Sequence, residues 1–211
     1  MSAAVIPSVG PAPARRSVET RAKLLAAARI LFARDGYHAV RPQDVAREAG
    51  VAQGTFYQYF DDKLACFLAF SDAIGTELGD ALDAELVGAG SFEDRLTRAL
   101  TGIFRYADAH PRELMAVMAD SRVLTAEALG GETLFDRWAE FWGAVLATGQ
   151  AEGRVRADLD LRLAGASVLG VVRQASAYGF GHGASEEAVI AHIRRFILGA
   201  VAPDRIEHAG A

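Results

Sequence analysis

The sequence predicts an all-α protein with two parts, an N-terminal three-helix helix-turn-helix domain and a larger C-terminal helical domain. Three observations support this fold class. Apolar residues recur at helical intervals, no segment shows sustained alternation of apolar and polar residues, and glycines interrupt the helical stretches. We expect a disordered tail over 1–14, the first domain over 15–63, the second over 64–201 and a flexible tail over 202–211.

The first helix is expected to run from about Ser17 to Arg34 and to stop at Gly36. The second helix is expected to begin at Pro42, because the missing N–H of proline would be unpaired at that position anyway. Asp44 in its first turn favours the positive end of the helix dipole. The apolar face of the first helix, wide enough to cover the next two, consists of Leu24, Ala27, Ala28 and Leu31, with Phe32 beside it.

The stretch Ala46–Lys63, AREAGVAQGTFYQYFDDK, has the pattern of a helix, a turn at a glycine and a second short helix. Gly50 can adopt the left-handed backbone conformation that ends a helix. The second helix is expected over 53–60, with Phe56 and Phe60 on its buried side. Its other side has amides in place of charges, which suits contact with base edges and phosphates. A helical hairpin of an ordinary bundle would show similar turn signals.

This region resembles the TetR family of one-component transcriptional regulators. In that family a helix ending in F-x-x-x-G-Y/F precedes a T-x-x-D-I-A-x-x-A-G-V helix, a G-T-F/L-Y-x-Y/H-F recognition helix and x-x-K. The chain departs from the pattern at Arg41, where a threonine or serine cap is usual, and at Ala52, which often corresponds to a serine. The resemblance is specific over Glu19 to Leu64. The matching residues are Phe32, Gly36, Tyr37, Asp44, Val45, Ala46, Ala49, Gly50, Val51, Gly54, Thr55, Phe56, Tyr57, Tyr59, Phe60 and Lys63.

The resemblance implies a homodimeric, sequence-specific DNA-binding regulator of transcription. We expect a repressor that leaves its double-stranded operator DNA when a small apolar or aromatic effector binds the C-terminal domain. The residues expected to contact DNA are Arg41, Gln43, Gln53, Gly54, Thr55, Tyr57, Gln58, Tyr59 and Lys63. Gln53 and Gln58 are exposed amides that can pair with adenine in the major groove. The alternative is a DNA-bound organising or partner-regulated protein with no small-molecule ligand.

Charge is distributed unevenly along the 211 residues, whose net charge is -5. Residues 15–63 contain nine basic and six acidic side chains, whereas the remainder contains 13 basic and 21 acidic ones. Positive charge is thus concentrated in the first domain and negative charge in the rest of the chain. This distribution is expected when the first domain binds the phosphates of DNA. No apolar run approaches the roughly 20 residues that cross a bilayer, and a single cysteine, Cys66, suits a reducing compartment. We therefore expect a cytoplasmic protein with no membrane partner.

Capping signals mark the starts of several later helices. Asp61 is expected to cap the helix that connects the two domains, and Asp160 to cap the penultimate helix. Ser91 and Asp94 have the spacing of a capping box, in which each side chain accepts a free backbone N–H at the helix start. The helices of the C-terminal domain are expected over 62–86, 92–109, 110–118, 132–151, 161–178 and 186–201.

Two surfaces compete for the apolar residues of the second domain. In TetR-like proteins the last two helices of each subunit pair as a four-helix bundle, and small residues such as Gly165, Ala166 and Gly170 would permit close helix approach here. The residues expected at this dimer interface are Val168, Val171, Val172, Ala175, Ile190, Ile193 and Ile197.

The second surface is a ligand cavity, which the resemblance places in the C-terminal domain. Aromatic and methionine side chains are more numerous there than one helical layer needs, and such residues line sites for small organic molecules. For any single one of them, packing in the protein core is the simpler explanation. The expected ligand-binding residues are Phe67, Phe70, Phe104, Met115, Met118, Phe135, Trp138, Phe141, Trp142 and Tyr178.

The sequence argues against an enzyme. The histidines are scattered over separate segments, and the chain has no H-E-x-x-H motif, no G-x-S-x-G motif and no glycine loop that cradles phosphate. Glu186, Glu187 and His192 are explained more simply as solvated charges near a helix end than as metal ligands. We therefore expect no catalytic residue, no cofactor and no metal site.

Overall fold

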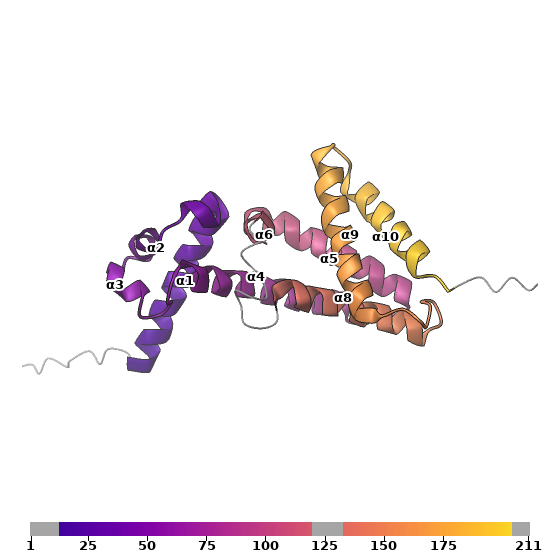
Figure 1. Cartoon of the computed structure of the whole chain (residues 1–211), viewed down its shortest axis with the longest axis horizontal. Helices are drawn as coiled ribbons and strands as arrows, with labels where there is room; N and C mark the ends of the chain where they lie inside the picture. Colours follow the sequence, from indigo (N-terminus) through magenta and orange to yellow (C-terminus); the bar gives the residue numbers. More distant parts are fainter. Residues whose placement is uncertain (1–12, 120–132, 204–211) are drawn as a thin grey trace, which may run out of the picture. The chain divides into compact units, whose positions relative to one another are not determined.

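The computed structural model describes residues 13–119 and 133–203, and every regular element in those ranges is an α-helix (Figure 1). The all-α prediction is therefore confirmed, and no strand occurs in the described residues. The helices are α1 (Pro13–Ala39), α2 (Pro42–Glu48), α3 (Gln53–Phe56), α4 (Lys63–Leu86), α5 (Phe92–Ala109), α6 (Pro111–Ala119), α8 (Leu134–Ala151), α9 (Leu161–Gly181) and α10 (Glu186–Val201). The predicted first residue of the helix over 132–151 lies outside the described residues.

The chain forms two compact units. The first unit contains the described residues up to Ser71 together with 115–119, so it extends past the predicted domain boundary after Lys63. The second unit contains 72–114 and the described residues from 133 onward. Helix α4 contributes its first turns to the first unit and its remaining turns to the second.

Helix α1 supplies the central apolar face of the first unit. It begins at Pro13, before the predicted start at Ser17, and its regular path is broken at Gly36, whose φ is 75°. Only glycine adopts that conformation without steric cost, which explains why the break falls at this residue. The five residues predicted for the apolar face are all buried: Leu24, Ala27, Ala28, Leu31 and Phe32.

Four aromatic rings, which we call the aromatic cluster, join α4 to α1 within the first unit. The ring of Phe32 lies 5.0 Å from that of Phe67 and 5.7 Å from that of Phe70, while the rings of Tyr37 and Phe67 are 4.9 Å apart. Phe67 is 0% and Phe70 is 1% exposed. Ring pairs at such distances stabilise a contact beyond their apolar burial alone. The start of α4 is thereby fixed to the end of α1.

The start of α4 is capped one residue later than predicted. The carboxylate of Asp62, and not that of Asp61, accepts a hydrogen bond from the backbone N–H of Ala65 at 2.8 Å. The reason is positional, because α4 begins at Lys63 and the residue just before a helix is the one whose side chain reaches its free N–H groups.

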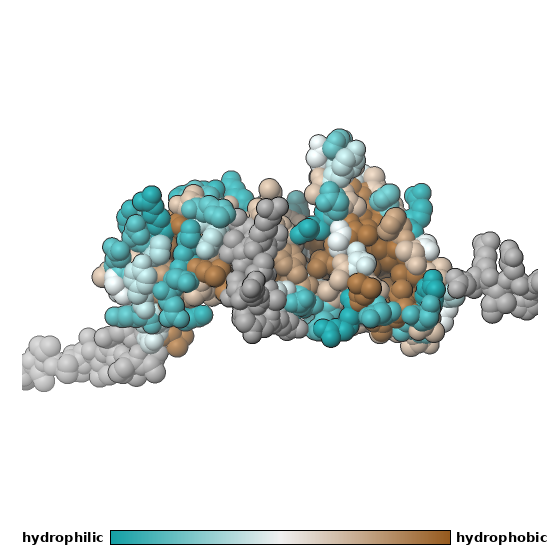
Figure 2. Space-filling view, in the orientation of Figure 1, coloured by the Kyte–Doolittle hydropathy of each residue, from teal (hydrophilic) through white to brown (hydrophobic). Residues whose placement is uncertain are grey.

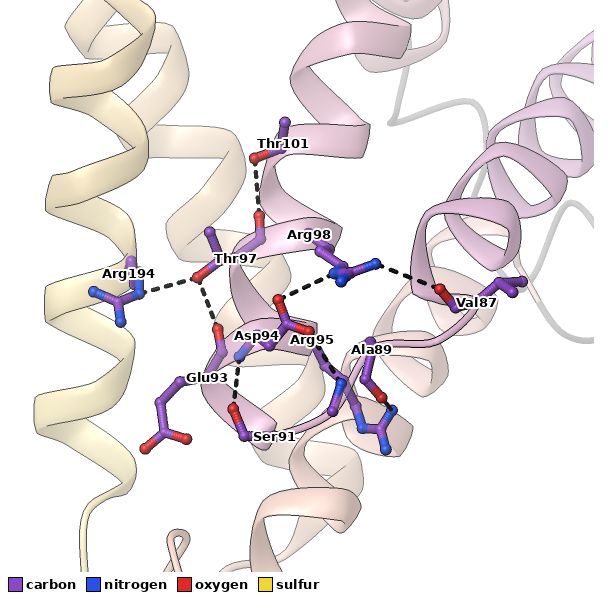
Figure 3. A network of polar contacts seen from close by, with 11 residues as sticks. Val87, Ala89, Ser91, Glu93, Asp94, Arg95, Thr97, Arg98, Thr101 and Arg194 are labelled. Atoms are coloured by element: carbon purple, nitrogen blue, oxygen red, sulfur yellow. Dashed lines mark hydrogen bonds and ion pairs between the residues drawn. The ribbon is translucent and has the colours of Figure 1, made fainter.

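Helix α5 of the second unit has a capped start (Figure 3). The hydroxyl of Ser91 accepts from the N–H of Asp94 at 3.2 Å, as predicted. The reciprocal bond goes to the residue before Ser91, since the Asp94 carboxylate accepts from the N–H of Gly90 at 3.0 Å. That bond and the guanidinium of Arg98 hold the pKa of Asp94 below its usual value. Arg98 also donates to the carbonyl of Val87, so one carboxylate and one guanidinium fix the loop between α4 and α5.

Helices α8 and α9 approach closely through two glycines. A Cβ atom at Gly165 would lie 2.1 Å from the carbonyl oxygen of Ala139, and one at Gly143 would lie 2.9 Å from the carbonyl oxygen of Leu161. Asp160 caps α9 as predicted, accepting from the N–H groups of residues 162 and 163. Backbone therefore packs directly on backbone at this crossing, and any side chain there would push the helices apart.

The predicted dimer interface is wrong for the inward residues of α9 and α10. Ile193 is 0% and Ile197 is 2% exposed within a single chain, and Val168 and Val172 are each 5% exposed. These four side chains belong to the core of the second unit, with residues of α5 and α8, while Val171, Ala175 and Ile190 are partly buried against the same core. An apolar stripe predicts burial but does not identify the surface that buries it.

Replacement of Gly165 by alanine tests the crossing of α8 and α9. We expect Gly165→Ala to lower the free energy of unfolding by about 1–3 kcal/mol, because the new methyl group would meet a backbone carbonyl that cannot rotate away. Gly79→Ala in α4 is the matched control, since a Cβ there meets nothing within 4 Å. This control should raise stability by roughly 0.5–1 kcal/mol in denaturant unfolding. Equal stability of the two variants would contradict the close crossing.

Candidate DNA-binding surface and effector site

Residues 42–60 form a helix-turn-helix in which local chemistry sets each bend. Helix α2 buries Val45 and Ala46, and the chain then reverses at Gly50, whose φ is 68°. The N–H of Val51 donates to the carbonyl of Ala46 at 3.0 Å, which closes the turn. Pro42 occupies the first position of α2, as predicted.

The recognition helix α3 is shorter than predicted. Regular α-helix covers only Gln53–Phe56, and the chain continues to Phe60 in tight turns. The N–H of Gln58 donates to the carbonyl of Thr55 at 3.2 Å, three residues back instead of four. Phe56 and Phe60 are 0% and 4% exposed, so the prediction that they share the buried side is confirmed.

Most of the predicted DNA-contacting residues lie on the solvent-facing side of this motif. Thr55, Tyr59 and Lys63 are partly buried. A Cβ atom added at Gly54 would meet nothing within 4 Å, so no internal contact requires a glycine there. A bare position on an exposed turn lets another backbone approach closely. The exposed members of the predicted set are Arg41, Gln43, Gln53, Gly54, Tyr57 and Gln58.

Lys63 has an internal role that the sequence did not indicate. Its ammonium donates to the carbonyls of Tyr37 at 3.0 Å and His38 at 3.4 Å, and it lies 4.3 Å from the centre of the Tyr37 ring. These carbonyls lie just after the break of α1 at Gly36, where regular helical hydrogen bonding is interrupted and a carbonyl needs another donor. Lys63 therefore links the start of α4 to the end of α1 and has one N–H left for an outside acceptor.

Other basic residues near the motif have partners inside the protein. The guanidinium of Arg21 lies 5.4 Å from the centre of the Phe60 ring, which connects α1 to the end of the recognition segment. Arg47 pairs with Asp44 at 2.7 Å, although its side chain is 78% exposed. At Arg41 the backbone N–H donates to the Asp44 carboxylate, whereas the side chain forms no capping hydrogen bond.

Cys66 is a core residue of the first unit. It is 0% exposed, and burial raises the pKa of its thiol to about 12. A thiol that stays protonated and inaccessible is a poor nucleophile and a poor metal ligand. This agrees with the simple reading of Cys66 as a small apolar residue.

The predicted effector residues do not form one group. Phe67 and Phe70 belong to the aromatic cluster of the first unit, so their assignment to a cavity of the second domain is corrected. Met115 and Tyr178 are 70% and 64% exposed. Met118 is partly buried and also belongs to the first unit. In the second unit, Phe104, Trp138 and Trp142 are buried, while Phe135 and Phe141 are partly buried.

Helices α9 and α10 expose large apolar side chains that the sequence analysis did not assign to the dimer interface. Figure 2 shows apolar residues gathered over these two helices. Leu163 lies on the side of α9 opposite the buried valines, whereas the ring of Phe180 lies 5.6 Å from that of the buried Phe104. Large apolar residues outside the buried stripe are the signal that could have found them. The exposed fractions are 68% for Leu163, 64% for Tyr178, 47% for Phe180 and 55% for Phe196.

Neither a metal site nor a membrane span is found in the part of the chain that the structure describes. No three histidine, cysteine, aspartate or glutamate side chains gather there in a group that could hold a metal ion. No helix among these residues is long and apolar enough to cross a bilayer.

Comparison with known families gives a match to the DNA-binding part of the chain. A profile described as "Bacterial regulatory proteins, tetR family" matches residues 24–70, which include α2, α3 and the aromatic cluster. Over these residues the chain is similar to the tetR family. Its helix-turn-helix is thus the DNA-binding element of a transcriptional regulator, and the match extends beyond the predicted boundary at Lys63, in agreement with the first unit.

Similarity to individual proteins extends beyond the helix-turn-helix. The HTH-type transcriptional repressor KstR2 of Rhodococcus jostii is 27% identical over 151 residues, which cover 68% of this chain and 72% of that protein. The fatty acid degradation regulator FadR of Bacillus halodurans has a TM-score of 0.68 at 20% identity, covering 90% of this chain and 97% of that one. FadR of Bacillus subtilis in complex with stearoyl-CoA has a TM-score of 0.70 at 18% identity, covering 85% and 98%. At these identities the structural likeness establishes the fold.

Substitution of Lys63 separates its internal role from a contact with phosphate. We expect Lys63→Met to lower the free energy of unfolding by roughly 1–2 kcal/mol, because two carbonyls of α1 lose a charged donor. The exposed Arg41→Met is the control, and it should leave stability unchanged while lowering the salt slope of DNA binding by about one per subunit. A Lys63→Met protein with unchanged stability and a slope reduced like that of the control would show that phosphate is the main partner of Lys63.

Substitution of Gln58 tests base reading. We expect Gln58→Ala to relax sequence preference at one symmetric pair of operator positions, by roughly 1–3 kcal/mol per contact, because the amide can pair with adenine. Selection of bound sequences from random DNA measures this preference. Recovery of the same motif by the variant and the parent would exclude Gln58 from base recognition.

Proposed function

We propose that this protein is a cytoplasmic, homodimeric repressor that binds double-stranded operator DNA through the exposed face of α3 and the turns that follow it. The observation that supports this most directly is the division of that segment, in which Phe56 and Phe60 are buried while Gln53, Tyr57 and Gln58 face solvent. Amides fixed by buried rings are suited to major-groove recognition. The basic charge of residues 15–63 adds attraction to phosphate.

The effector that we propose is a small, largely apolar molecule of the long-chain acyl class. Two of the structural neighbours are regulators of fatty acid metabolism, and one of them contains stearoyl-CoA. In this chain the proposed site lies in the second unit, where α8 supplies two tryptophans and two phenylalanines within two helical turns. Aromatic side chains with few polar groups are typical of sites for such ligands.

Release from DNA would follow from a shift between two conformations. Helix α4 is shared by both units, so an effector that prefers one placement of this helix changes the population of states that can bind the operator. Two recognition helices must enter successive major grooves, about 34 Å apart, for both half-sites to be contacted. A change in that separation weakens binding without any contact between effector and DNA.

The test combines DNA binding with ligand-dependent stability. A DNA motif is first selected from a random library, and binding to that motif is then titrated with stearoyl-CoA and, as a control, with free coenzyme A. We expect stearoyl-CoA alone to raise the melting temperature of the free protein and to weaken operator binding, because a ligand that prefers the free form must do both. Selective DNA binding without any response to acyl compounds would instead favour the DNA-bound or partner-regulated protein with no ligand.

The surface that we propose for the dimer is the outer face of α9 and α10. Leu163, Tyr178 and Phe196 are 68%, 64% and 55% exposed there, and large apolar side chains that face solvent can mark an interaction site. A short recognition segment touches only a few base pairs, so selectivity requires a second copy, and two-fold symmetry supplies it. This outer face replaces the inward stripe that includes Ile193.

Phe196→Glu tests this surface. We expect the variant to sediment as a folded monomer and to lose operator binding, because a glutamate placed between two copies would be buried without a partner. Val87→Glu, at a position that is 76% exposed at the end of α4, is the control and should remain dimeric. Ile193→Asp is expected to unfold the protein, since its carboxylate would lie in the core. A folded dimer of Phe196→Glu at micromolar concentration would exclude this face.

A further inference from the structure

Helix α8 presents one buried stripe in which residues four apart have different surroundings. Leu134, Trp138 and Trp142 are 6%, 7% and 1% exposed. Trp142 belongs to the main core of the second unit, whereas Leu134 and Trp138 are buried outside that core. The first two turns of α8 are therefore covered by something other than the packing that holds α5, α8, α9 and α10 together.

Contacts with α4 show which side of α8 this is. A Cβ atom at Gly75 would lie 2.1 Å from Cδ1 of Leu134, so the side chain of Leu134 rests on the bare backbone of α4. One residue before Trp138, Arg137 donates to the carboxylate of Asp72 at 2.5 Å. Leu134 and Arg137 thus join α8 to the shared helix α4, and Trp138 follows them in the next positions of α8.

The indole N–H of Trp138 is buried and has no hydrogen-bond partner among the residues that the structure describes. In folded proteins the large majority of buried polar groups are paired, and an unpaired donor is costly. The neighbouring polar groups on this part of α8 are satisfied, since Thr133 and Asp136 bond to each other and Arg137 bonds to Asp72. Phe135, whose ring lies 5.5 Å from that of Trp138, provides no acceptor.

We infer that Trp138 is the polar anchor of the effector site and donates its indole N–H to an acceptor oxygen on an otherwise apolar ligand. This inference rests on the proposed function and adds the residue and the ligand group. The partner is an uncharged carbonyl of the ketone, ester or thioester kind, because a single neutral N–H donor can pair with it without burying a charge. A hydrocarbon of the same length would fit the same apolar surroundings but leave the donor unpaired, and sites built around a buried donor discriminate on that basis.

Trp138→Phe and a matched pair of probes test the inference. The probes are 2-decanone and decane, which share a chain length and differ in one carbonyl. In the parent protein we expect 2-decanone to bind more tightly than decane, and in Trp138→Phe we expect this preference to fall by roughly three- to tenfold. Trp138→Phe removes buried ring atoms, so some loss of stability is expected from packing alone. Phe92→Leu, which also removes buried ring atoms but from the main core of the second unit, is the control, and there the preference should persist.

Fluorescence gives a second measurement that does not depend on DNA. The chain has two tryptophans, so Trp142→Phe leaves Trp138 as the only one. Its emission should move to longer wavelength with 2-decanone and remain unchanged with decane. Equal binding of both probes to the parent and to Trp138→Phe would overturn this inference while leaving an apolar effector site in place. An unaltered preference for 2-decanone in Trp138→Phe would also overturn it, whatever the change in stability, by showing that the indole N–H is not the source of the preference. Failure of the parent to bind either probe or stearoyl-CoA would overturn both proposals.

Discussion

The packing of Phe67 and Phe70 against Phe32 and Tyr37 is the contact on which the DNA-binding unit depends. These rings hold the first turns of α4 on the end of α1, and the recognition segment lies between α1 and α4 in the chain. The Lys63 ammonium strengthens the same junction by bonding to the last carbonyls of α1. Because the junction is buried and aromatic, the first turns of α4 and the recognition segment belong to one packed unit.

In the second unit the corresponding constraint is the close crossing of α8 and α9. With glycines at the crossing point, the two backbones meet, and the valines of α9 point past the contact into the core that α5 and α10 complete. The inward side chains of α9 and α10 are therefore already buried within a single chain. Phe196 and Leu163 remain outside, and their burial requires a second molecule. The same geometry therefore explains both why the inward stripe cannot be the dimer surface and why the outer face is suited to that role.

The features that were predicted well from the sequence are those that depend on interactions between residues close together in the chain. Pro42, Gly50, Ser91 and Asp160 each act on backbone groups within four residues, so their roles follow from spacing alone. The errors concern long-range choices. Ile193 has the periodicity of a buried residue, but periodicity does not distinguish the chain's own core from a partner. Phe67 and Phe70 are aromatic residues near a boundary, and only the fold shows that they pack on α1, which precedes them in the sequence.

Lys63 and Trp138 show how the fold distinguishes structural from functional polar groups. The Lys63 ammonium was expected to face DNA, yet two carbonyls and an aromatic ring of α1 already satisfy most of its bonding capacity. The Trp138 indole was expected to line a cavity mainly through its apolar surface, yet its N–H is the group left without a partner. A buried donor without a partner lowers stability, and that loss can be recovered when a ligand supplies the acceptor. Trp138 lies next to the contacts of α8 with α4. A hydrogen bond between a ligand and Trp138 would therefore form beside the helix that the DNA-binding unit shares.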